Sequence, residues 1–568
     1  MPGSRTDTAF LAAVAAAADE RARGLLAGVD GLLAGAPHHR EVMSAAKALV
    51  ACAVHPGSAL FASAEAAGAA ARLVDFLAGM QGANGLFDGE NLASPPDTAF
   101  TINDLCDAYG LLQGDSVPES LRPLAGALEL IAAAAAGPLR LGGVHTPNHR
   151  WELSAALARL NAHWPDARLV ARVDQWLAEG VDIAPDGMYS ERSPNYSLYV
   201  SNPSLTAIGV LLDRPELLDA VCRNLEAVAA TALPDGTVET VHSRRQDQRG
   251  PIALAPFLMQ FRRYAIARGR GDFAAVAADI FAQGLDGRGL EGPLPYLADA
   301  LAEVLLEPAL AGVLPEPEAP QAVSTVFPSA GLAVARDGAF AVTVFGGSDY
   351  AEHGWIRSGL SSNPTFLRVY SGGAVLDSVR LSRDFFGMGP FRAGEFALEG
   401  GEFVLRERVA AAYYQPLPAE HRRADGDYAL MDDGRFSASM DFAHRPRDAF
   451  ALSTEARVRV GEGEVRLGVE ADPGGVRQVL ELAFREGGEL EGVRPLANGG
   501  FEPVGGAFAY RRGGGLIAVH VDETGPAGLG YHPGEDYTHL SGTDAAEGLR
   551  VYVPLPRTGR STLVLRTR

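Results

Sequence analysis

The sequence predicts an α+β protein in which an N-terminal (α/α) toroid, complete or incomplete, precedes a C-terminal antiparallel β-sandwich. Apolar residues recur every three or four positions through residues 1–312, as in amphipathic helices. Beyond residue 325 the period changes to two, and Gly-rich turns separate short alternating segments. A stretch rich in Pro and Glu lies between the two patterns. We therefore expect a helical domain at 1–312, a linker at 313–325 and a β-sandwich at 326–568.

The helical half contains roughly a dozen apolar stripes, each long enough for one helix. The clearest begins at Trp151 and places Leu153, Leu157, Leu160 and Trp164 on one face. Similar stripes occupy Phe10–Leu33, Val42–Val54, Ala64–Met80, Leu105–Leu112, Leu124–Ala135, Leu205–Leu212, Leu218–Ala230 and Ile252–Ala267.

Asp-Gly turns recur at Asp88-Gly89, Asp186-Gly187 and Asp235-Gly236, each followed by polar and aromatic residues before the next helix. Helical hairpins whose long loops gather at one end are typical of an α/α toroid. An α-solenoid is the alternative, but it should show a tighter fixed period.

The C-terminal half carries alternating segments that predict strands. Regular antiparallel spacing of this kind over the whole half favours a large sandwich. The clearest strands are expected at 340–344, 366–370, 403–405, 456–460 and 465–469.

Charge and composition exclude several classes of function. A net charge of −21 argues against nucleic-acid or anionic-membrane partners, because both require a dominant basic face. Local basic clusters can still bind an anionic small substrate. Cys52, Cys106 and Cys222 are too widely spaced for a disulfide framework or a cysteine-based zinc site.

No segment reads as a targeting or membrane sequence. Asp7 and Asp19-Glu20 interrupt the Ala-rich N-terminus, which predicts a surface helix rather than a secretion signal. No uninterrupted run of ~18 apolar residues occurs, so no membrane span is expected. The expected location is cytoplasmic, and a homo-oligomer is compatible with the sequence.

The string HTPNHRWE, from His145 to Glu152, predicts an anion site at the start of a helix. Thr146 is a plausible N-cap and Pro147 suits the first helical position. Asn148 and His149 then fall in the first turn, where the helix dipole and unpaired amides favour an anion. The alternative is that both residues only cap the helix.

The string DGMYSERSPNYSLYV offers Tyr189, Tyr196 and Tyr199, with Glu191 and Arg192 nearby. A tyrosine acts as base near neutral pH only when its ordinary pKa of ~10 is lowered, which an adjacent arginine can do. The alternative is that these rings pack between helices with their hydroxyls hydrogen-bonded.

The string HSRRQDQR, which begins at His242, follows the third Asp-Gly turn. It contains His242, Arg244 and Arg245, and arginine is suited to bidentate binding of carboxylates. A solvated charged loop is the alternative.

In the β half, His353 lies in Glu-His-Gly-Trp, and Tyr413 and Tyr414 end a predicted strand. His353 with Asp377 is weak evidence for a metal, so no metal site is assigned and no cofactor is expected to be required, with structural zinc or calcium as the alternative. Asp97 and Asp104 in the helical half could bind sugar or form a carboxylate pair, and the alternative is that an Asp near Pro-Pro, such as Asp97, only caps a helix.

These segments together resemble the heparinase II/III-like polysaccharide lyases and the related oligoalginate lyases. The resemblance consists of Asn148-His149, then Asp186-Gly187 with Glu191, Ser193-Pro194 and Tyr196, and finally His353-Gly354, Gly372-Gly373 and Leu376-Asp377. It covers nearly the whole chain in the order α domain, then β domain.

The resemblance implies β-elimination at a 4-linked uronic acid, in an acidic oligosaccharide or polysaccharide. Asn148 and His149 would neutralise the carboxylate, so that the enolate-like intermediate is stabilised. Tyr196 would act as base or acid, and His353 as a second proton-transfer or binding group. Substrate-binding roles would fall to Tyr189, Arg192, His242, Arg244, Arg245, Tyr413, Tyr414 and Asp97.

Two positions depart from the family pattern. Ser197 stands where family members often have a histidine after the tyrosine, and Trp355 replaces the second histidine of a His-Gly-His string. The departures concern the metal site and the second catalytic group, for which Tyr413 or Tyr414 could compensate.

Two other functions remain open. An inverting glycoside hydrolase needs two carboxylates about 6.5–9.5 Å apart. Its candidates are Asp97, Asp104, Asp186, Glu191 and Asp235. A non-catalytic carbohydrate-binding protein would bind acidic oligosaccharide without turnover.

Overall fold

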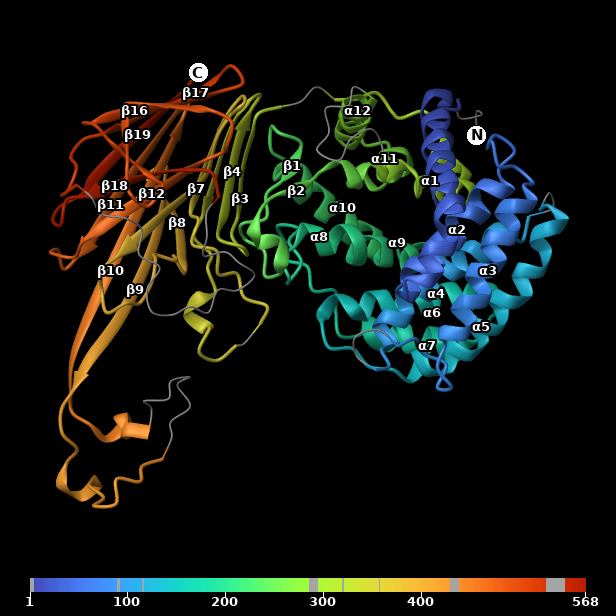
Figure 1. Ribbon diagram of the computed structural model, residues 1–568, viewed down its shortest axis with the longest axis horizontal. Helices are drawn as coiled ribbons and strands as arrows, with labels where there is room; N and C mark the ends of the chain where they lie inside the picture. The colour runs from blue at the N-terminus through green and yellow to red at the C-terminus, as the bar shows by residue number, and fades with distance from the viewer. Residues whose placement is uncertain are drawn as a thin grey trace. The chain divides into compact units, whose positions relative to one another are not determined.

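The computed structural model describes residues 5–88, 92–114, 117–285, 295–318, 321–356, 358–429, 439–527 and 547–568 (Figure 1). Gly89 of the first Asp-Gly turn and residues 319–320 of the expected linker lie outside these ranges. The chain divides into two compact units. The helical unit contains Met1–Ser190, Asn195–Ala229 and Ala253–Pro320, and the β unit contains Glu191–Pro194, Ala230–Ile252 and Gln321–Arg568.

The helical unit is built from consecutive α-helices, as the apolar stripes predict (Figure 1). A π-helical turn, Ser197–Ser201, joins α8 to α9. The helices are α1 (Thr8–Ala34), α2 (His39–Val54), α3 (Ala64–Met80), α4 (Pro95–Leu111), α5 (Arg122–Leu141), α6 (Pro147–His163), α7 (Ala167–Leu177), α8 (Pro194–Tyr196), α9 (Asn202–Leu211), α10 (Pro215–Ala230), α11 (Leu258–Arg268), α12 (Gly271–Leu285) and α13 (Ala300–Leu306).

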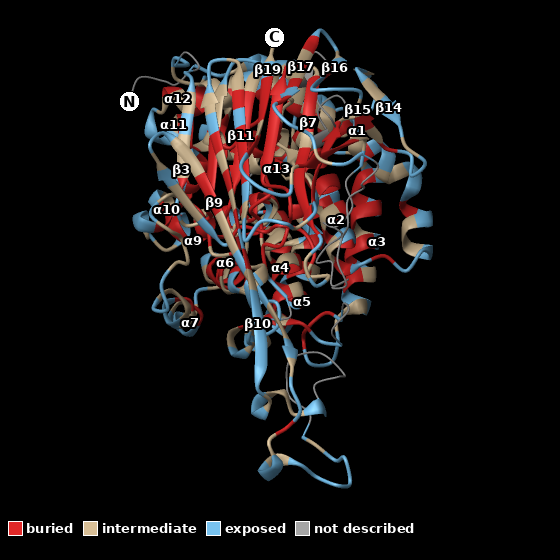
Figure 2. Cartoon of the chain, turned by 90° about the vertical axis from the view of Figure 1, so that its left-hand side faces the viewer, coloured by how far each residue is buried: buried red, intermediate tan, exposed pale blue. Residues whose placement is uncertain are grey.

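The helices form two layers, which is the arrangement of an α/α toroid. In the inner layer α2 packs on α4, α4 on α6 and α6 on α9. In the outer layer α3 packs on α5 and α5 on α7, and each outer helix also contacts an inner one. Inner helices are buried on most sides, as in α6, whereas α7 buries only Leu169 and Val173 (Figure 2).

One segment of the outer layer, Glu119–Leu141, is long and apolar enough to cross a membrane, whereas the sequence predicted no span. One such helix is weak evidence, because a core helix passes the same test. Leu124, Leu128, Ile131 and Leu139 of α5 are buried. α5 also packs against α3, α4 and α6. One face of α5 is thus used in packing within the helical unit, and 33% of the apolar window is buried.

A seven-residue turn recurs three times in the chain. Isolated bridges close it at Gln81–Phe87, Ile183–Tyr189 and Ala232–Val238. Its centre is Asn84-Gly85, Asp186-Gly187 or Asp235-Gly236, and each glycine has φ between 80° and 86°. The first of these turns lies at Asn84-Gly85, whereas the expected turn at Asp88-Gly89 lies partly outside the described residues.

Glycine is required in this turn for two reasons. A positive φ strains residues that carry a Cβ. A Cβ at Gly187 would also lie 2.3 Å from the carbonyl oxygen of Arg223.

The β unit contains two large sheets (Figure 1). The nine-stranded sheet has the order β14-β15-β18-β12-β7-β6-β5-β4-β3, and the eight-stranded sheet has the order β13-β16-β17-β19-β11-β10-β9-β8. Pairing is antiparallel except between β15 and β18. Each of the five strands expected from the sequence is part of one of these sheets.

The strands of the nine-stranded sheet are β3 (Val323–Phe327), β4 (Leu332–Asp337), β5 (Phe340–Phe345), β6 (Leu367–Ser371), β7 (Ala374–Arg383), β12 (Gln478–Phe484), β14 (Val493–Pro495), β15 (Phe501–Pro503) and β18 (Leu549–Leu555). Those of the eight-stranded sheet are β8 (Glu395–Glu399), β9 (Glu402–Tyr414), β10 (Arg447–Gly461), β11 (Glu464–Asp472), β13 (Glu489–Glu491), β16 (Ala507–Arg512), β17 (Gly515–Val521) and β19 (Ser561–Thr567).

A single core joins the two sheets into a sandwich. Leu376, Leu482 and Val551 of one sheet belong to the same buried cluster as Leu467 and Leu563 of the other. Because side chains alternate along a strand, the intervening residues lie on the outer face of each sheet.

Two segments that precede the linker pack with the β unit. β1 (Thr237–Val238) and β2 (Ile252–Ala253) form a small sheet of their own. Leu233 is buried with Ala341, Tyr370 and Val375 of the nine-stranded sheet. The expected helical domain at 1–312 therefore contains parts of the β unit.

Candidate active site

The helix α6 begins as the sequence predicts, with Thr146 as N-cap and Pro147 in the first turn. The Thr146 hydroxyl does not cap the helix but donates a hydrogen bond to Oδ1 of Asn148 at 2.7 Å. Asn148 is buried, and its Nδ2 has no hydrogen-bond partner among the described residues. An unpaired buried donor costs about 1–3 kcal/mol, so this amide is suited to receive an anionic ligand.

His149 follows at the same helix start and is half-buried. Its ring packs edge-on against the ring of His145, with the centroids 4.8 Å apart. The predicted Asn-His pair therefore lies in the first turn of an inner helix of the toroid.

Glu152 lies one helical turn beyond Asn148 and had no role in the sequence analysis. It is buried and accepts hydrogen bonds from Asn103 Nδ2 at 2.6 Å and from Ser204 Oγ at 2.9 Å. Burial raises the pKa of this carboxyl to about 7, although hydrogen bonds from Asn103 and Ser204 and the charges of Arg159 and Arg40 oppose the shift. Glu152 thus connects the inner helices α4, α6 and α9.

Arg40, at the start of α2, is the other residue that the sequence analysis missed. It forms an ion pair with Asp97 at the start of α4 and lies over the Phe100 ring at 3.8 Å. Burial lowers the pKa of its guanidinium, while the charges of Glu152 and Tyr196 act in the opposite direction. Arg40 therefore lies within electrostatic range of both groups.

These contacts gather Asn148, Glu152, Arg40, Asp97 and Tyr196 at one end of the inner layer. The N-terminal ends of α2, α4 and α6 meet there. Helix N-termini carry partial positive charge, which favours a bound anion.

Tyr196 ends the short helix α8 and is immediately followed by the π-helical turn. Turns of this kind are rare and often occur at functional sites. Tyr196 is half-buried, whereas Tyr199 within the same turn is 58% exposed. Tyr196 is therefore the tyrosine of this segment that lies within electrostatic range of Arg40.

Tyr189 has a different environment from the one expected of a substrate-binding residue. It is buried, and its hydroxyl donates to Asn202 Oδ1 at 2.9 Å. Asn202 in turn donates to Asn224 and Gln260. Burial raises the pKa of Tyr189 well above its ordinary value. The residue serves the internal hydrogen-bond network of the helical unit.

Basic residues of the β unit that the sequence assigned to substrate binding are engaged within that unit. Arg244 holds Asp349 with two hydrogen bonds of 2.8 Å. Arg192 donates to the carbonyl oxygens of Gly347 and Ser329, and Arg245 pairs with Glu191 at 3.5 Å. These bonds attach the segments 191–194 and 230–252 to the β unit.

His242 is fully buried in the β unit, and neither ring nitrogen has a hydrogen-bond partner among the described residues. Burial, assisted by the charge of Arg192, lowers its pKa to about 3. The ring is therefore neutral near pH 7 and does not provide the positive charge expected for binding an anion.

His353 is exposed and stacks on Tyr350 with ring centroids 4.4 Å apart. Arg392 lies over the same Tyr350 ring at 4.0 Å. Asp377, the other residue considered for a metal, is held by two hydrogen bonds from Arg485. Among the described residues, no group of three or more His, Cys, Asp or Glu side chains could hold a metal ion.

Tyr413 and Tyr414 lie at the end of β9, on a ribbon that β9 and β10 extend beyond their neighbours (Figure 1). Tyr413 is 64% exposed and clusters with Phe386 and Phe450. Tyr414 packs on Phe442 with ring centroids 4.5 Å apart.

Most candidate carboxylates for a hydrolase form ion pairs. Asp97 pairs with Arg40, Asp104 with Lys47, Asp235 with Arg485 and Glu191 with Arg245. Asp186 accepts a hydrogen bond from the Met188 amide at 3.4 Å.

No protein-family model and no curated relative matches the sequence. Three solved structures are similar in fold. The Paenibacillus xanthan lyase is 11% identical with a TM-score of 0.50, over 96% of this chain and 57% of its own. The Pedobacter heparinus heparan sulfate lyase HepC is 11% identical with a TM-score of 0.47, over 93% of this chain and 76% of its own. The Streptomyces coelicolor chondroitin AC lyase is 12% identical with a TM-score of 0.45, over 98% and 96%.

The similarity to the xanthan lyase shows a shared fold, which agrees with the toroid and sandwich predicted from the sequence. The present chain spans only 57% of the length of that lyase. What the two chains are shown to share is the toroid-and-sandwich fold.

Proposed function

We propose that the chain is a carbon–oxygen lyase that cleaves a 4-linked uronic-acid glycan by β-elimination. The observation that carries the proposal is the amide of Asn148, a buried donor without a partner at the N-terminus of an inner helix. A carboxylate is the ligand that suits such a donor at this position. The resemblance to heparinase II/III-like lyases and the shared fold support the same reaction class.

In the proposed reaction, Asn148 Nδ2 and the His149 ring bind the uronate carboxylate. Their donors stabilise the negative charge that develops when the C5 proton leaves. The C5–H electrons form the C4=C5 double bond, the C4–O4 bond breaks, and O4 departs with a proton. The products are one fragment with the unsaturated uronate at its non-reducing end and a second fragment with a new reducing end, whose anomeric hydroxyl contains O4.

Tyr196 is the proposed proton-transfer group. The positive charge of Arg40 lies within electrostatic range of the Tyr196 side chain. Tyr196 performs one of the two proton transfers as base or acid, and His353 is the proposed second proton-transfer group. These steps use only side chains of this chain, so activity is expected to persist after treatment with a chelator.

The test is a screen of uronate-containing glycans for the ultraviolet absorbance of the C4=C5 double bond. Wild type should generate the absorbing product, and Asn148→Ala and Tyr196→Phe should each reduce kcat by at least about 100-fold. Tyr199→Phe is the matched control, because it removes a hydroxyl from the same turn but at an exposed position. Cleavage without the ultraviolet product would indicate a hydrolase, and binding without cleavage would indicate a non-catalytic protein.

A further inference from the structure

A hollow of about 860 Å³ lies within the β unit, and its lining includes none of the residues assigned to catalysis. Its volume is within the range of ordinary small-molecule sites. It is lined by Arg249, Gly250, Pro251, Asn363, Thr365, Arg368, Asp377, Ser378, Arg380, Ala483, Arg485, Glu486, Glu547, Gly548 and Arg550.

The hollow lies on the outer face of the nine-stranded sheet. Leu367 and Val369 of β6 and Val379 and Leu381 of β7 belong to the sandwich core. Arg368 and Arg380 alternate with them and therefore point to the opposite face.

The floor of the hollow is polar and pre-organised. Arg368 is 4% exposed and Arg380 is 2% exposed, and each is held by a carboxylate, Glu239 at 3.5 Å and Glu481 at 2.9 Å. The hydroxyls of Thr365 and Ser378 hydrogen-bond to each other at 2.7 Å. Side chains fixed in this way can bind a ligand with little loss of conformational entropy.

Donors remain at this floor after the internal contacts are made. A guanidinium has five N–H donors, and one carboxylate uses only part of them. The ion pair of Arg368 runs from its buried Nε to Oε2 of Glu239 at 3.5 Å and includes no hydrogen bond. An acceptor supplied by a ligand in the hollow would give this guanidinium a closer partner.

The mouth of the hollow carries further ionisable groups. Arg249 and Arg550 line it, and neither has an ion-pair partner among the residues that the structure describes. Arginines outnumber carboxylates in the lining, in a chain whose net charge is −21. Glu486 and Glu547 are exposed there and can accept hydrogen bonds from hydroxyls.

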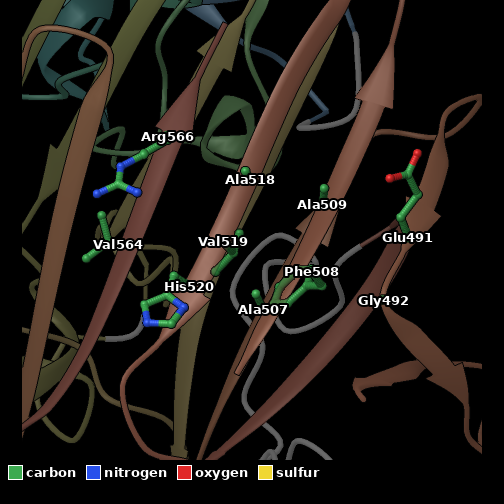
Figure 3. Close-up of a pocket in the computed structure, with 10 residues that line it drawn as sticks. All are labelled: Glu491, Gly492, Ala507, Phe508, Ala509, Ala518, Val519, His520, Val564 and Arg566. Atoms are coloured by element: carbon green, nitrogen blue, oxygen red, sulfur yellow. The ribbon is translucent and has the colours of Figure 1, made fainter. Parts of the chain in front are cut away.

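A second hollow of about 500 Å³ on the eight-stranded sheet has a different character (Figure 3). Its centre is formed by Ala507, Ala509 and Ala518, and Glu491, His520 and Arg566 lie apart at its edges. It has no cluster of arginines comparable with that of the larger hollow.

We propose that the larger hollow is a binding subsite for an acidic sugar unit, built from residues other than those assigned to catalysis. Arg249 and Arg550 bind its carboxylate or sulfate at the mouth, Arg368 donates from the floor, and the glutamates accept from its hydroxyls. No aromatic side chain lines the hollow among the described residues, so recognition depends on charge and hydrogen bonding rather than on stacking. The choice of ligand rests on the proposed function.

The test uses calorimetry to measure the binding of sugar probes to the full chain carrying Asn148→Ala. This substitution removes the side chain that is proposed to bind the substrate carboxylate in the active site. The probes are a galacturonate tetramer, a heparin-derived tetrasaccharide and neutral cellotetraose. We expect an acidic probe to bind with an affinity that falls as salt is raised, and cellotetraose not to bind. Adding Arg249→Gln with Arg550→Gln should weaken binding at least tenfold.

The matched control is Arg466→Gln with Arg511→Gln, which removes the same charge at two exposed positions outside the hollow. Equal loss of affinity in both double variants, unchanged affinity in the first, or no binding of either acidic probe would overturn the proposal. The difference between the two acidic probes tells whether carboxylate alone suffices or sulfate is needed. Wild-type turnover in the ultraviolet screen is a separate measurement, so failure of the lyase proposal is distinguishable from failure of this one.

Discussion

The hydroxyl of Thr146 donates a hydrogen bond of 2.7 Å to Oδ1 of Asn148. The side-chain oxygen of Asn148 is therefore engaged, and the amide offers a ligand its nitrogen, which donates. The arrangement fixes which end of the amide a ligand meets. An amide that could flip would offer a carboxylate either two donors or a repelling oxygen.

Thr146→Val should therefore lower kcat/KM for the proposed elimination about tenfold, since it removes the bond that orients Asn148. Thr146→Ser keeps the hydroxyl and should stay within about twofold of wild type. The initial rate of ultraviolet absorbance measures both variants. Equal loss in the valine and serine variants would contradict an orienting role for the hydroxyl.

Glu152→Gln should change how the stability of the helical unit depends on pH. The folded pKa of Glu152, about 7, lies above its ordinary value of 4.5, so the carboxyl favours the folded state at low pH. That contribution is lost as the pH rises through about 7. Relative to wild type, the variant should gain about 2 kcal/mol in free energy of unfolding between pH 5 and pH 8.

Denaturant unfolding at the two pH values measures this difference. Glu129→Gln, an exposed substitution on α5, is the control and should show little change. A Glu152→Gln variant that loses stability relative to wild type as the pH rises would show that the ionised carboxylate is the favoured form.

His242 should make the β unit sensitive to acid. Its folded pKa of about 3 is below its ordinary 6.5, so protons bind more readily to the unfolded chain between these values. The contribution of neutral His242 to the free energy of unfolding is fully present above about pH 6.5 and is lost as the pH falls towards 3. At pH 5 the loss from this residue should be about 2 kcal/mol relative to neutral pH.

His242→Leu should remove this part of the acid sensitivity, because leucine cannot be protonated and no hydrogen bond to the ring is lost. His520→Leu, at an exposed position of the same unit, serves as the comparison. Thermal unfolding between pH 4.5 and 7.5 gives the measurement. Parallel pH profiles for wild type and His242→Leu would refute the assignment.

Arg244→Ala should destabilise the β unit by about 2 kcal/mol, since it leaves the largely buried Asp349 without its bidentate partner. The double variant with Asp349→Asn should recover part of that loss, because the uncompensated charge is removed. A double-mutant cycle by urea unfolding measures the coupling. Purely additive losses would show that the two side chains do not stabilise each other.

The sequence was sufficient to predict the change from helical to β structure and the residue at which α6 begins. Thr146, Pro147 and the positions of Asn148 and His149 follow from local capping rules, which act over a few residues. The strands of the sandwich followed from strict alternation.

Those local rules could not predict contacts between residues that are far apart in the sequence. Arg40 approaches Glu152 and Tyr196 only because α4 packs on both α2 and α6, and the π-helical turn before α9 packs on α6. Glu152 could have been noticed from its position one turn after Asn148, on the same face of the helix. Tyr189 and His242 were expected to bind substrate because of their residue types, but burial in the fold determines their environment.

The assignment of Glu191–Pro194 and Ala230–Ile252 to the β unit has a consequence for how such a protein can be divided. The polypeptide alternates between the two units several times before residue 321. No single cut can release either unit whole, and a fragment starting at residue 326 would lack Leu233, Glu239 and Arg244. Recombination at the Pro-rich segment therefore could not exchange the two units as independent modules, and the two must be inherited together.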